Sequence, residues 1–392
     1  MHSKRWLRSF WVALLSVGLG SISLTTAVIA QIVIAQREPP STIKRQALDL
    51  HERLQESGHA MSAMPGPGAK GYSRFPTMGS AVFDAQLSGY RAYVAAEGTP
   101  DILIVGSSRA LQGIDPSELR YQLSAQGYDE PQVYNFSVNG ATAQVVNFVV
   151  GELLPGELPG VIVWGDGSRA FNNGRPDRTW ESLIASPGYQ AVISGERSGD
   201  ALAANEFEQQ NSAEIELSEI ELEVDEQEIT STRTNAAKID RFGFSAVSDR
   251  FDPATYYQEF AKVHGQYDGA YSPFILEGSQ AEALGRLATF LQAQGSQLIF
   301  VNLPLSDDYL DAYRLQYENQ FQDFLVAQAD RYRFEVIDLL TQWRSQPELF
   351  ADPSHINQYG AAAIAQHLAR DPSFLLAVNS AVDSSVAPAS AF

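Results

Sequence analysis

The chain has 392 residues, a formal net charge of −20 at pH 7, 44% hydrophobic residues and no cysteine. The apolar share is ordinary for a packed globular protein and excludes a wholly disordered chain, and the length provides ample material for a buried core. The negative charge argues against binding to nucleic acid, whose phosphates require clustered Lys and Arg. The lack of cysteine excludes disulfides, thiolate metal sites, cysteine nucleophiles and lipid attachment through cysteine.

A basic leader, residues 1–9, precedes a segment without any charged residue, residues 10–35. At a rise of about 1.5 Å per residue, a helix of that length exceeds the hydrocarbon core of a bilayer, about 30 Å. The three basic residues of the leader favour an orientation that leaves the rest of the chain outside the cytoplasm. The pattern predicts a single-pass transmembrane signal anchor in contact with membrane lipid. A cleaved signal peptide is the alternative, because Val28-Ile29-Ala30 resembles a small-residue cleavage site.

The rest of the chain divides by composition. Residues 36–83 contain Pro39-Pro40 and a Pro/Gly-rich stretch, typical of a stalk, whereas an α/β domain is expected over residues 84–376 and a disordered tail over residues 377–392. Inside the domain, residues 205–230 hold ten acidic residues and no Lys or Arg. We interpret this segment as a solvated, disordered insertion. Calcium binding is the alternative, but the acids lack the Asp-x-Asp-x-Asp-Gly frame of a calcium loop.

Five short, continuous apolar runs indicate strands that are buried on both faces, as in parallel sheets. They are residues 101–105, 133–138, 161–164, 297–303 and 334–339. Segments with helical periodicity alternate with them, which predicts an α/β fold whose five-stranded, mostly parallel sheet is covered by helices on both faces. In such sheets ligands bind beyond the carboxyl ends of the strands, so the residues that follow each strand are the ones to inspect.

Helix starts and apolar stripes support this alternation. Asp115-Pro116-Ser117-Glu118 predicts a helix N-terminus with Asp115 as the cap, and Ser279-Gln280-Ala281-Glu282 predicts a capping box. The second helix carries an apolar stripe of Leu284, Leu287 and Leu291. A further stripe predicts a third helix, with Leu310, Tyr313, Tyr317, Phe321, Phe324 and Leu325.

Two strand exits carry small residues suited to catalysis. Gly106-Ser107-Ser108-Arg109 follows the first strand directly. A serine at such a tight strand-to-helix turn exposes its hydroxyl among backbone N–H groups. After the second strand, Gly140 permits close backbone approach, so its N–H can point at a developing oxyanion. Each exit taken alone is also compatible with an ordinary turn.

The third exit, late in the chain, supplies a base. Asp352 stands three residues before His355, on a loop that enters a helical run. In that arrangement the carboxylate holds the imidazole in one tautomer, and the other ring nitrogen can accept a proton from a serine hydroxyl. Of the six histidines, His264 and His367 are expected to be structural, and no two histidines have the spacing of metal ligands. We therefore expect no metal and no cofactor.

Taken in order, the Gly-x-Ser turn, the block Asn135-x-Ser-x-x-Gly-x-Thr142 and the late Asp-x-x-His resemble the SGNH (GDSL-type) hydrolase superfamily, over residues 100–170 and 295–370. The resemblance implies a three-layer flavodoxin-like fold. It implies that Ser108 is the nucleophile, that Gly140 and the Ser108 N–H are oxyanion donors, and that Asp352 and His355 complete a triad. Ser107 stands where the family has Asp, so the chain resembles a divergent membrane-anchored branch with Gly-Ser-Ser-Arg in place of Gly-Asp-Ser.

The third family block also departs from its pattern. The family has Gly-x-Asn-Asp after the third strand, with Asn as an oxyanion donor, but here Gly167 follows Gly165-Asp166 in place of that Asn. Arg169 and Asn172 are candidates for the missing donor, unless the donor is absent. Arg109 is a candidate for binding an anionic group of the substrate.

These residues predict a membrane-anchored serine esterase or O-acyltransferase. Ser108 attacks the ester carbonyl, His355 transfers the proton and Asp352 orients His355. The expected substrate is an acylated carbohydrate or another O-acyl ester on the periplasmic or extracellular side. The alternative is a catalytically decayed binding or assembly protein of the cell envelope with other envelope proteins as partners, suggested by the altered first and third blocks. The distance between the Ser108 hydroxyl and the His355 imidazole separates the two hypotheses.

Overall fold

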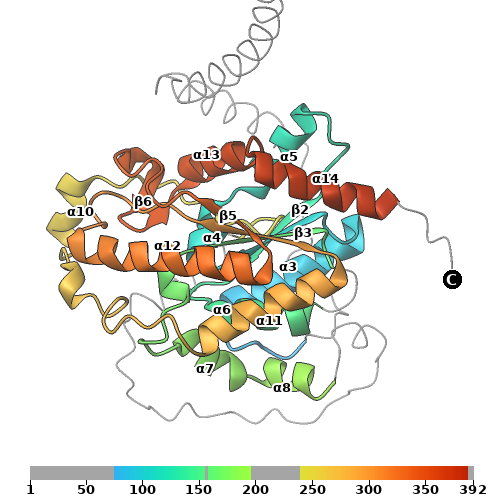
Figure 1. Ribbon diagram of the computed structural model, residues 1–392, viewed down its shortest axis with the longest axis horizontal. Coiled ribbons are helices and arrows are strands. Elements are labelled where there is room, and N and C mark those ends of the chain that lie inside the picture. The colour runs from blue at the N-terminus through green and yellow to red at the C-terminus, as the bar shows by residue number, and fades with distance from the viewer. Residues whose placement is uncertain (1–74, 155–157, 196–238, 387–392) are drawn as a thin grey trace, which may run out of the picture. The chain divides into compact units, whose positions relative to one another are not determined.

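A computed structural model describes residues 75–154, 158–195 and 239–386 (Figure 1). The expected anchor, most of the expected stalk and the acidic segment 205–230 lie outside the described residues. Within the ranges that are described, none of the helices combines the length and the apolar character that a membrane span requires.

The centre of the fold is a five-stranded sheet in the order β2-β1-β3-β4-β5, with every neighbouring pair parallel. The strands are β1 (Ile102–Gly106), β2 (Val133–Ser137), β3 (Val161–Asp166), β4 (Gln297–Asn302) and β5 (Glu335–Asp338). Each of the five apolar runs is thus a strand, and the prediction of a parallel five-stranded sheet is confirmed. All residues of β1, β2 and β3 are buried, which explains their uninterrupted apolar character.

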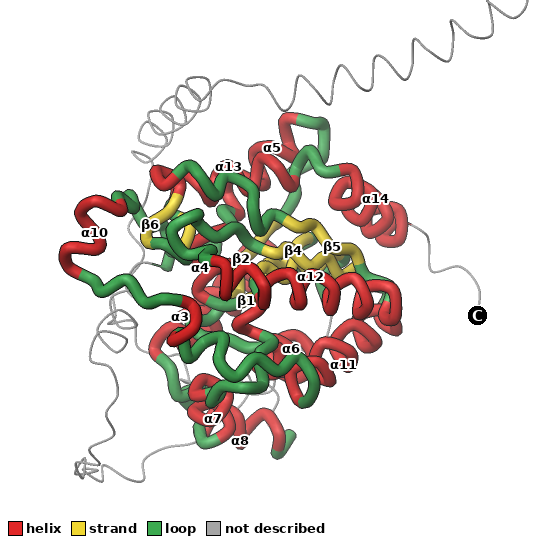
Figure 2. Tube along the Cα trace, turned by 60° about the vertical axis from the view of Figure 1, so that its left-hand side comes forward, coloured by secondary structure: helices red, strands yellow, loops and turns green. Residues whose placement is uncertain are grey.

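Helices cover both faces of this sheet (Figures 1 and 2). One apolar core joins the sheet to α3 (Ala81–Glu97), α6 (Ala143–Phe148), α11 (Ser279–Gln294) and α12 (Ala312–Tyr332). The other core joins it to α4 (Ser108–Gly113), α5 (Pro116–Ala125), α13 (Gln358–Leu368) and α14 (Pro372–Val386). Figure 2 shows the strands between the two groups of helices. The sheet is therefore the middle layer of three.

Shorter elements connect these layers. They are a π-helical turn (Val149–Leu153), 3₁₀ turns at Ser168–Ala170, Gly265–Tyr267 and Pro347–Leu349, helices α7 (Arg178–Ile184), α8 (Pro187–Ile193) and α10 (Pro253–Glu259), and a two-stranded antiparallel hairpin, β6 (Phe350–Asp352) and β7 (His355–Ile356).

Of three local predictions, one is confirmed, one is wrong and one holds for only part of its residues. Asp115 caps α5 as predicted, with its carboxylate accepting from the N–H groups of Ser117 and Glu118. The predicted capping box at Ser279 is wrong, because Gly278 is the N-cap and the Ser279 hydroxyl donates instead to the side chain of Asn173. In α12, Phe321 and Leu325 are buried, whereas Tyr313 of the same predicted stripe is 42% exposed.

The domain extends beyond the expected boundaries. Helix α3 begins at Ala81, where Ser80 caps it, ahead of the expected start at residue 84. Helix α14 continues to Val386, so the described part of the expected tail is helical. Phe374 and Val378 of α14 are buried in the core, and their packing stabilises the helix. So short a segment showed no clear helical periodicity in the sequence.

A glycine at the end of β1 allows the strands and α4 to meet closely. Gly106 has φ +148, and a Cβ there would lie 2.0 Å from the carbonyl oxygen of Gly165 and 2.9 Å from the Cβ of Ala110. Neither backbone conformation nor space permits a side chain. Gly106 therefore lets α4 start directly at the carboxyl edge of the sheet.

We expect Gly106→Ala to lower the thermal unfolding midpoint much more than Gly98→Ala does. Gly98 also has a positive φ, of +86, but no heavy atom lies within 4 Å of its added Cβ. Its substitution therefore costs only the backbone strain, roughly 1–2 kcal/mol. At Gly106 overpacking adds a further cost of about 1–3 kcal/mol. Equal losses for the two variants in calorimetry would contradict the close approach of β1 and β3.

Candidate active site

Ser108 is the first residue of α4, directly beyond β1. Ser107 caps the helix, its hydroxyl oxygen accepting from the N–H of Arg109 at 3.3 Å. The side-chain amide of Asn135 in β2 donates to the carbonyls of Ala110 (2.9 Å) and Ile114 (3.1 Å). Since Asn135 is fully buried, these bonds fix α4 to the neighbouring strand. The Ser108 hydroxyl is thereby held at the edge of the sheet.

A buried carboxylate supports the turn that carries Ser108. Asp166, at the end of β3, accepts from the N–H of Ser107 (3.1 Å), the hydroxyl of Ser107 (3.0 Å) and the N–H of Gly167 (3.0 Å). It is 2% exposed, and burial raises its pKa to about 6 against the opposing effect of Arg109. Sequence reasoning did not assign a role to Asp166, although it follows an apolar strand directly. The carboxylate that holds the turn before Ser108 thus comes from the end of β3.

The β6–β7 hairpin places Asp352 opposite His355. Asp352 Oδ2 lies 2.8 Å from His355 Nδ1, and Asp352 Oδ1 accepts from the N–H groups of Ser354 (2.7 Å) and His355 (2.9 Å). Asn357 caps α13 immediately afterwards by accepting from two backbone N–H groups. The hairpin and the cap together fix the orientation of the imidazole ring.

The expected meeting of hydroxyl and imidazole is present. Ser108 Oγ lies 2.9 Å from His355 Nε2, although 247 positions separate the two residues in the chain. With the contact from His355 to Asp352, the three side chains form one continuous series of hydrogen bonds. Burial acts to raise the pKa of Asp352, but the charge of His355 and the hydrogen bonds from its ring and from two backbone N–H groups outweigh it and lower that pKa to about 2.

Two residues that line the same cavity, Ser108 and Gly140, have backbone N–H groups without an acceptor among the described residues. In the part of the chain that the structure describes, no oxygen accepts from the N–H of Ser108 or of Gly140. Gly140 has φ +67, and a Cβ there would lie 2.6 Å from the hydroxyl of Thr179. Both residues line a cavity of about 360 Å³, together with Ser107, Arg109, Gln112, Asn139, Ala141, Asp166, Arg169, Ala170, Arg175, Ala270, Asp352 and His355.

The three remaining candidates take different positions. Arg109 and Arg169 line the cavity, and Arg169 donates to the Tyr309 hydroxyl at 3.3 Å. Asn172 does not supply an oxyanion donor: its amide nitrogen donates to the carbonyls of Ala270 and Pro273, and its oxygen accepts from two backbone N–H groups. Asn172 instead holds the loop of residues 270–275, of which Ala270 lines the cavity.

The cavity contains polar side chains to which sequence reasoning assigned no role, Asn139 among them, and two histidines that were expected to be structural lie outside it. Asn139, beside Gly140, has a buried side-chain oxygen without a hydrogen-bond partner among the described residues. His264 accepts from the N–H of Gln266, and the ring of His367 packs against Trp343. Neither histidine lines the cavity, so His355 supplies its imidazole.

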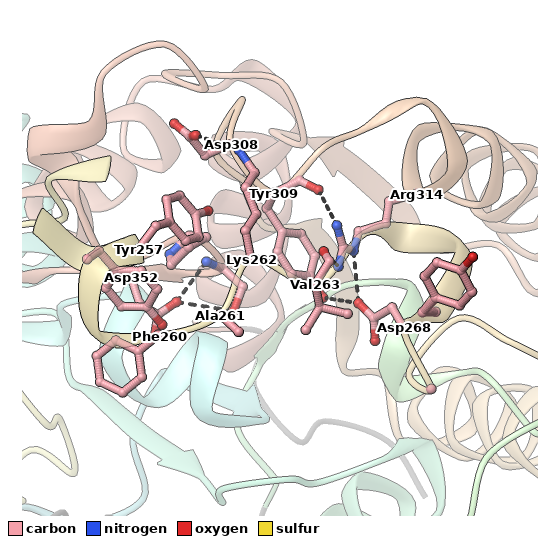
Figure 3. Close-up of a pocket in the computed structure, with 15 residues that line it drawn as sticks. Tyr257, Phe260, Ala261, Lys262, Val263, Asp268, Asp308, Tyr309, Arg314 and Asp352 are labelled. Atoms are coloured by element: carbon pink, nitrogen blue, oxygen red, sulfur yellow. Dashed lines mark hydrogen bonds and ion pairs between the residues drawn. The ribbon is translucent and has the colours of Figure 1, made fainter. Parts of the chain in front are cut away.

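A second cavity, of about 450 Å³, shares Asp352 with the first. Figure 3 shows Tyr257 and Phe260 on one side of it and Arg314 on the other. Arg314 is held by Asp268 at 2.8 Å and by Asp311 at 3.0 Å. Aromatic rings and charged groups thus line a cavity next to Asp352.

No protein-family model and no curated protein matches this chain. Among solved structures, the lipase/acylhydrolase from Enterococcus faecalis matches with 11% identity and a TM-score of 0.35, covering 69% of this chain and 95% of that chain. TesA matches with 15% identity and a TM-score of 0.34, covering 71% and 98%. A protein ascribed to the G-D-S-L lipolytic family, from Desulfitobacterium hafniense DCB-2, matches with 10% identity and a TM-score of 0.32, covering 69% and 97%. At these identities and TM-scores, function has to be inferred from the geometry of the site itself.

The lowered pKa of Asp352 predicts a pH-dependent contribution to stability. Because the folded value of about 2 lies below the ordinary 3.8, the ionised carboxylate stabilises the fold above about pH 4. That stabilisation is lost as the pH falls through about 2. The side chain is 32% exposed, so solvent screening reduces the expected contribution to about 1–2 kcal/mol.

Urea unfolding at pH 7, 4 and 3 measures this contribution. The difference in unfolding free energy between the wild type and Asp352→Asn is expected to be largest at pH 7 and to shrink below pH 4. Asp129→Asn, at an exposed loop position, controls for the loss of one negative charge. A difference that stays constant across the range would contradict the lowered pKa.

Proposed function

We propose that this protein is a serine hydrolase that cleaves carboxylic esters. The observation that carries the proposal is the series Ser108 Oγ–His355 Nε2 (2.9 Å) and His355 Nδ1–Asp352 Oδ2 (2.8 Å). A nucleophile, a base within hydrogen-bond reach and a carboxylate that orients the base are the elements of acyl transfer through a covalent intermediate. The N–H groups of Ser108 and Gly140, in the same cavity and without an acceptor among the described residues, suit a developing oxyanion.

The proposed reaction uses these contacts. Ser108 Oγ attacks the carbonyl carbon while its proton passes to His355 Nε2, and the carbonyl oxygen becomes an oxyanion near the N–H groups of Ser108 and Gly140. Collapse of this intermediate expels the alcohol, which takes the proton from His355. A water molecule, or an acceptor hydroxyl in a transferase, then attacks the acyl-enzyme by the same steps in reverse. Asp352 keeps Nδ1 protonated, so Nε2 is the free acceptor.

We propose O-acyl esters of carbohydrate as the substrate class. Tyr256, Tyr257 and Phe260 line the second cavity, and such rings present flat apolar faces on which a sugar ring can stack. Asp352 borders both cavities, so an acyl group beside Ser108 leaves the alcohol portion directed toward these rings. The uncharged segment 10–35 supports the proposal that the domain is anchored in a membrane and lies on its extracytoplasmic side.

Replacement of Ser108 by Ala is expected to reduce the hydrolysis of a short-chain aryl ester at least about 10³-fold in kcat. Ser124→Ala, at an exposed position of α5, is the matched control and is expected to leave kcat unchanged. Steady-state assays of ester hydrolysis with the full chain give kcat for both variants. A wild-type chain without esterase activity would favour the binding protein with a decayed site. A fully active Ser108→Ala variant would show that the activity does not depend on the Ser108 hydroxyl and would overturn the proposed mechanism.

Binding of a sugar in the second cavity can be tested separately from ester hydrolysis. We expect Tyr257→Ala to raise KM for an acetylated oligosaccharide several-fold and to leave KM for an aryl acetate unchanged, because only the sugar reaches the second cavity. Tyr121→Ala removes a tyrosine that is 51% exposed on α5, and it is expected to change neither value. Equal KM values for the wild type and Tyr257→Ala on the oligosaccharide would contradict this assignment.

A further inference from the structure

The guanidinium of Arg109 lies where a side chain at position 167 would begin. A Cβ built on Gly167 would be 1.8 Å from Arg109 Nη1, so the absence of a side chain at Gly167 makes room for the arginine. Arg109 is 4% exposed. Its Nη2 donates to the carbonyls of Leu303 and Pro304, beyond the end of β4. These two bonds hold the guanidinium across the carboxyl ends of β3 and β4.

The other two nitrogens of the guanidinium have no hydrogen-bond acceptor among the described residues. Among the residues that the structure describes, no oxygen accepts a hydrogen bond from Nη1 or Nε of Arg109. Neither nitrogen is among the fully buried polar atoms that lack a partner, so both keep some exposure, and a ligand or an intermediate in the cavity can supply the acceptor. Arg109 lines the same cavity as Ser108, Gly140 and His355. Its unused donors therefore belong to the cavity in which the acyl group would sit.

The surroundings of Arg109 balance its charge without occupying those donors. The nearby buried carboxylates, Asp166 and Glu318, are bonded to other groups. Asp166 accepts from Ser107 and Gly167, and Glu318 accepts from the hydroxyls of Ser168 and Tyr271. Arg169, the other arginine considered as a donor, already donates to Tyr309 and lies 5.4 Å from the centre of the Tyr309 ring. Arg109 is thus held by two backbone carbonyls and still has two nitrogens without an acceptor among the described residues.

We propose that Arg109 is a catalytic oxyanion donor, acting beside the N–H groups of Ser108 and Gly140. This inference rests on the proposed function. As the bond from Ser108 Oγ to the carbonyl carbon forms, the π electron pair moves onto the carbonyl oxygen, and that oxygen accepts from the guanidinium. When the bond to the alcohol oxygen breaks, the pair returns and the alcohol takes the proton held by His355. Arg109 transfers no proton in this sequence, because a guanidinium keeps its protons at any pH at which the protein is folded.

Kinetics on p-nitrophenyl acetate test the inference, because this neutral ester offers no anionic group to an arginine. Arg109→Met is expected to lower kcat about 10²–10³-fold with little change in KM, since the donor acts on the intermediate and not on the bound ester. Arg109→Lys is expected to retain part of the activity, because it keeps the charge. A loss in Arg109→Met that appears in KM alone would overturn the inference and indicate an anchoring role.

A double variant separates donation from structural support. In Arg109→Ala/Gly167→Asn, the volume vacated by the guanidinium receives a short side-chain amide, and kcat is expected to exceed that of Arg109→Ala at least tenfold. Gly167→Asn alone is expected to be destabilised, since its Cβ would collide with Nη1. Thermal unfolding midpoints of all variants show which of them fold. If Arg109→Met does not fold, the kcat values of Arg109→Lys and of the double variant test the role of Arg109.

The outcomes for the inference and for the proposed function are distinct. A wild-type chain that hydrolyses the ester, with Ser108→Ala inactive and Arg109→Met fully active, would overturn the role of Arg109 and leave the proposed function intact. A folded double variant no more active than Arg109→Ala would also count against donation. A wild-type chain without any esterase activity would remove the proposed function and, with it, this inference.

Discussion

The contact between the Ser108 hydroxyl and the His355 imidazole is the constraint on which the account of this site depends. It joins residues that are 247 positions apart, and it exists only because β1 and the β6–β7 hairpin end at the same edge of the structure. Gly106 allows α4 to start without a gap after β1, and the hairpin presents Asp352 and His355 face to face. The catalytic chemistry that we propose is therefore a consequence of strand order and of one glycine.

Two carboxylates near the site have pKa values that are shifted in opposite directions. Burial raises the pKa of Asp166 to about 6, and Asp166 accepts hydrogen bonds from the turn that carries Ser108. For Asp352, the hydrogen bonds and the charge of His355 outweigh burial and lower the pKa to about 2. Asp166 therefore stabilises backbone geometry, whereas Asp352, ionised throughout the neutral range, is suited to orient an imidazole and to stabilise its cation.

Much of the fold and of the triad could be predicted from the sequence, because the relevant signals are local. Uninterrupted apolar runs mark strands buried on both faces, and Asp352, three residues before His355, marks an oriented imidazole. Features that depend on tertiary contacts could not be predicted. The Ser279 hydroxyl donates to Asn173 and does not cap its helix, and core packing stabilises α14 beyond the expected end of the domain. For the same reason, the loop-holding bonds of Asn172 could not be foreseen from its position after a strand.

The position of the nucleophile is the central claim, and mapping of a covalent adduct tests it most directly. The full chain is treated with a fluorophosphonate, digested and analysed by tandem mass spectrometry, with His355→Ala as the comparison. The account predicts one stoichiometric adduct on Ser108 in the wild type and a greatly reduced yield in His355→Ala, because the base that activates the hydroxyl is missing. An adduct on another serine such as Ser354, or no adduct in a wild-type chain that hydrolyses esters, would contradict it.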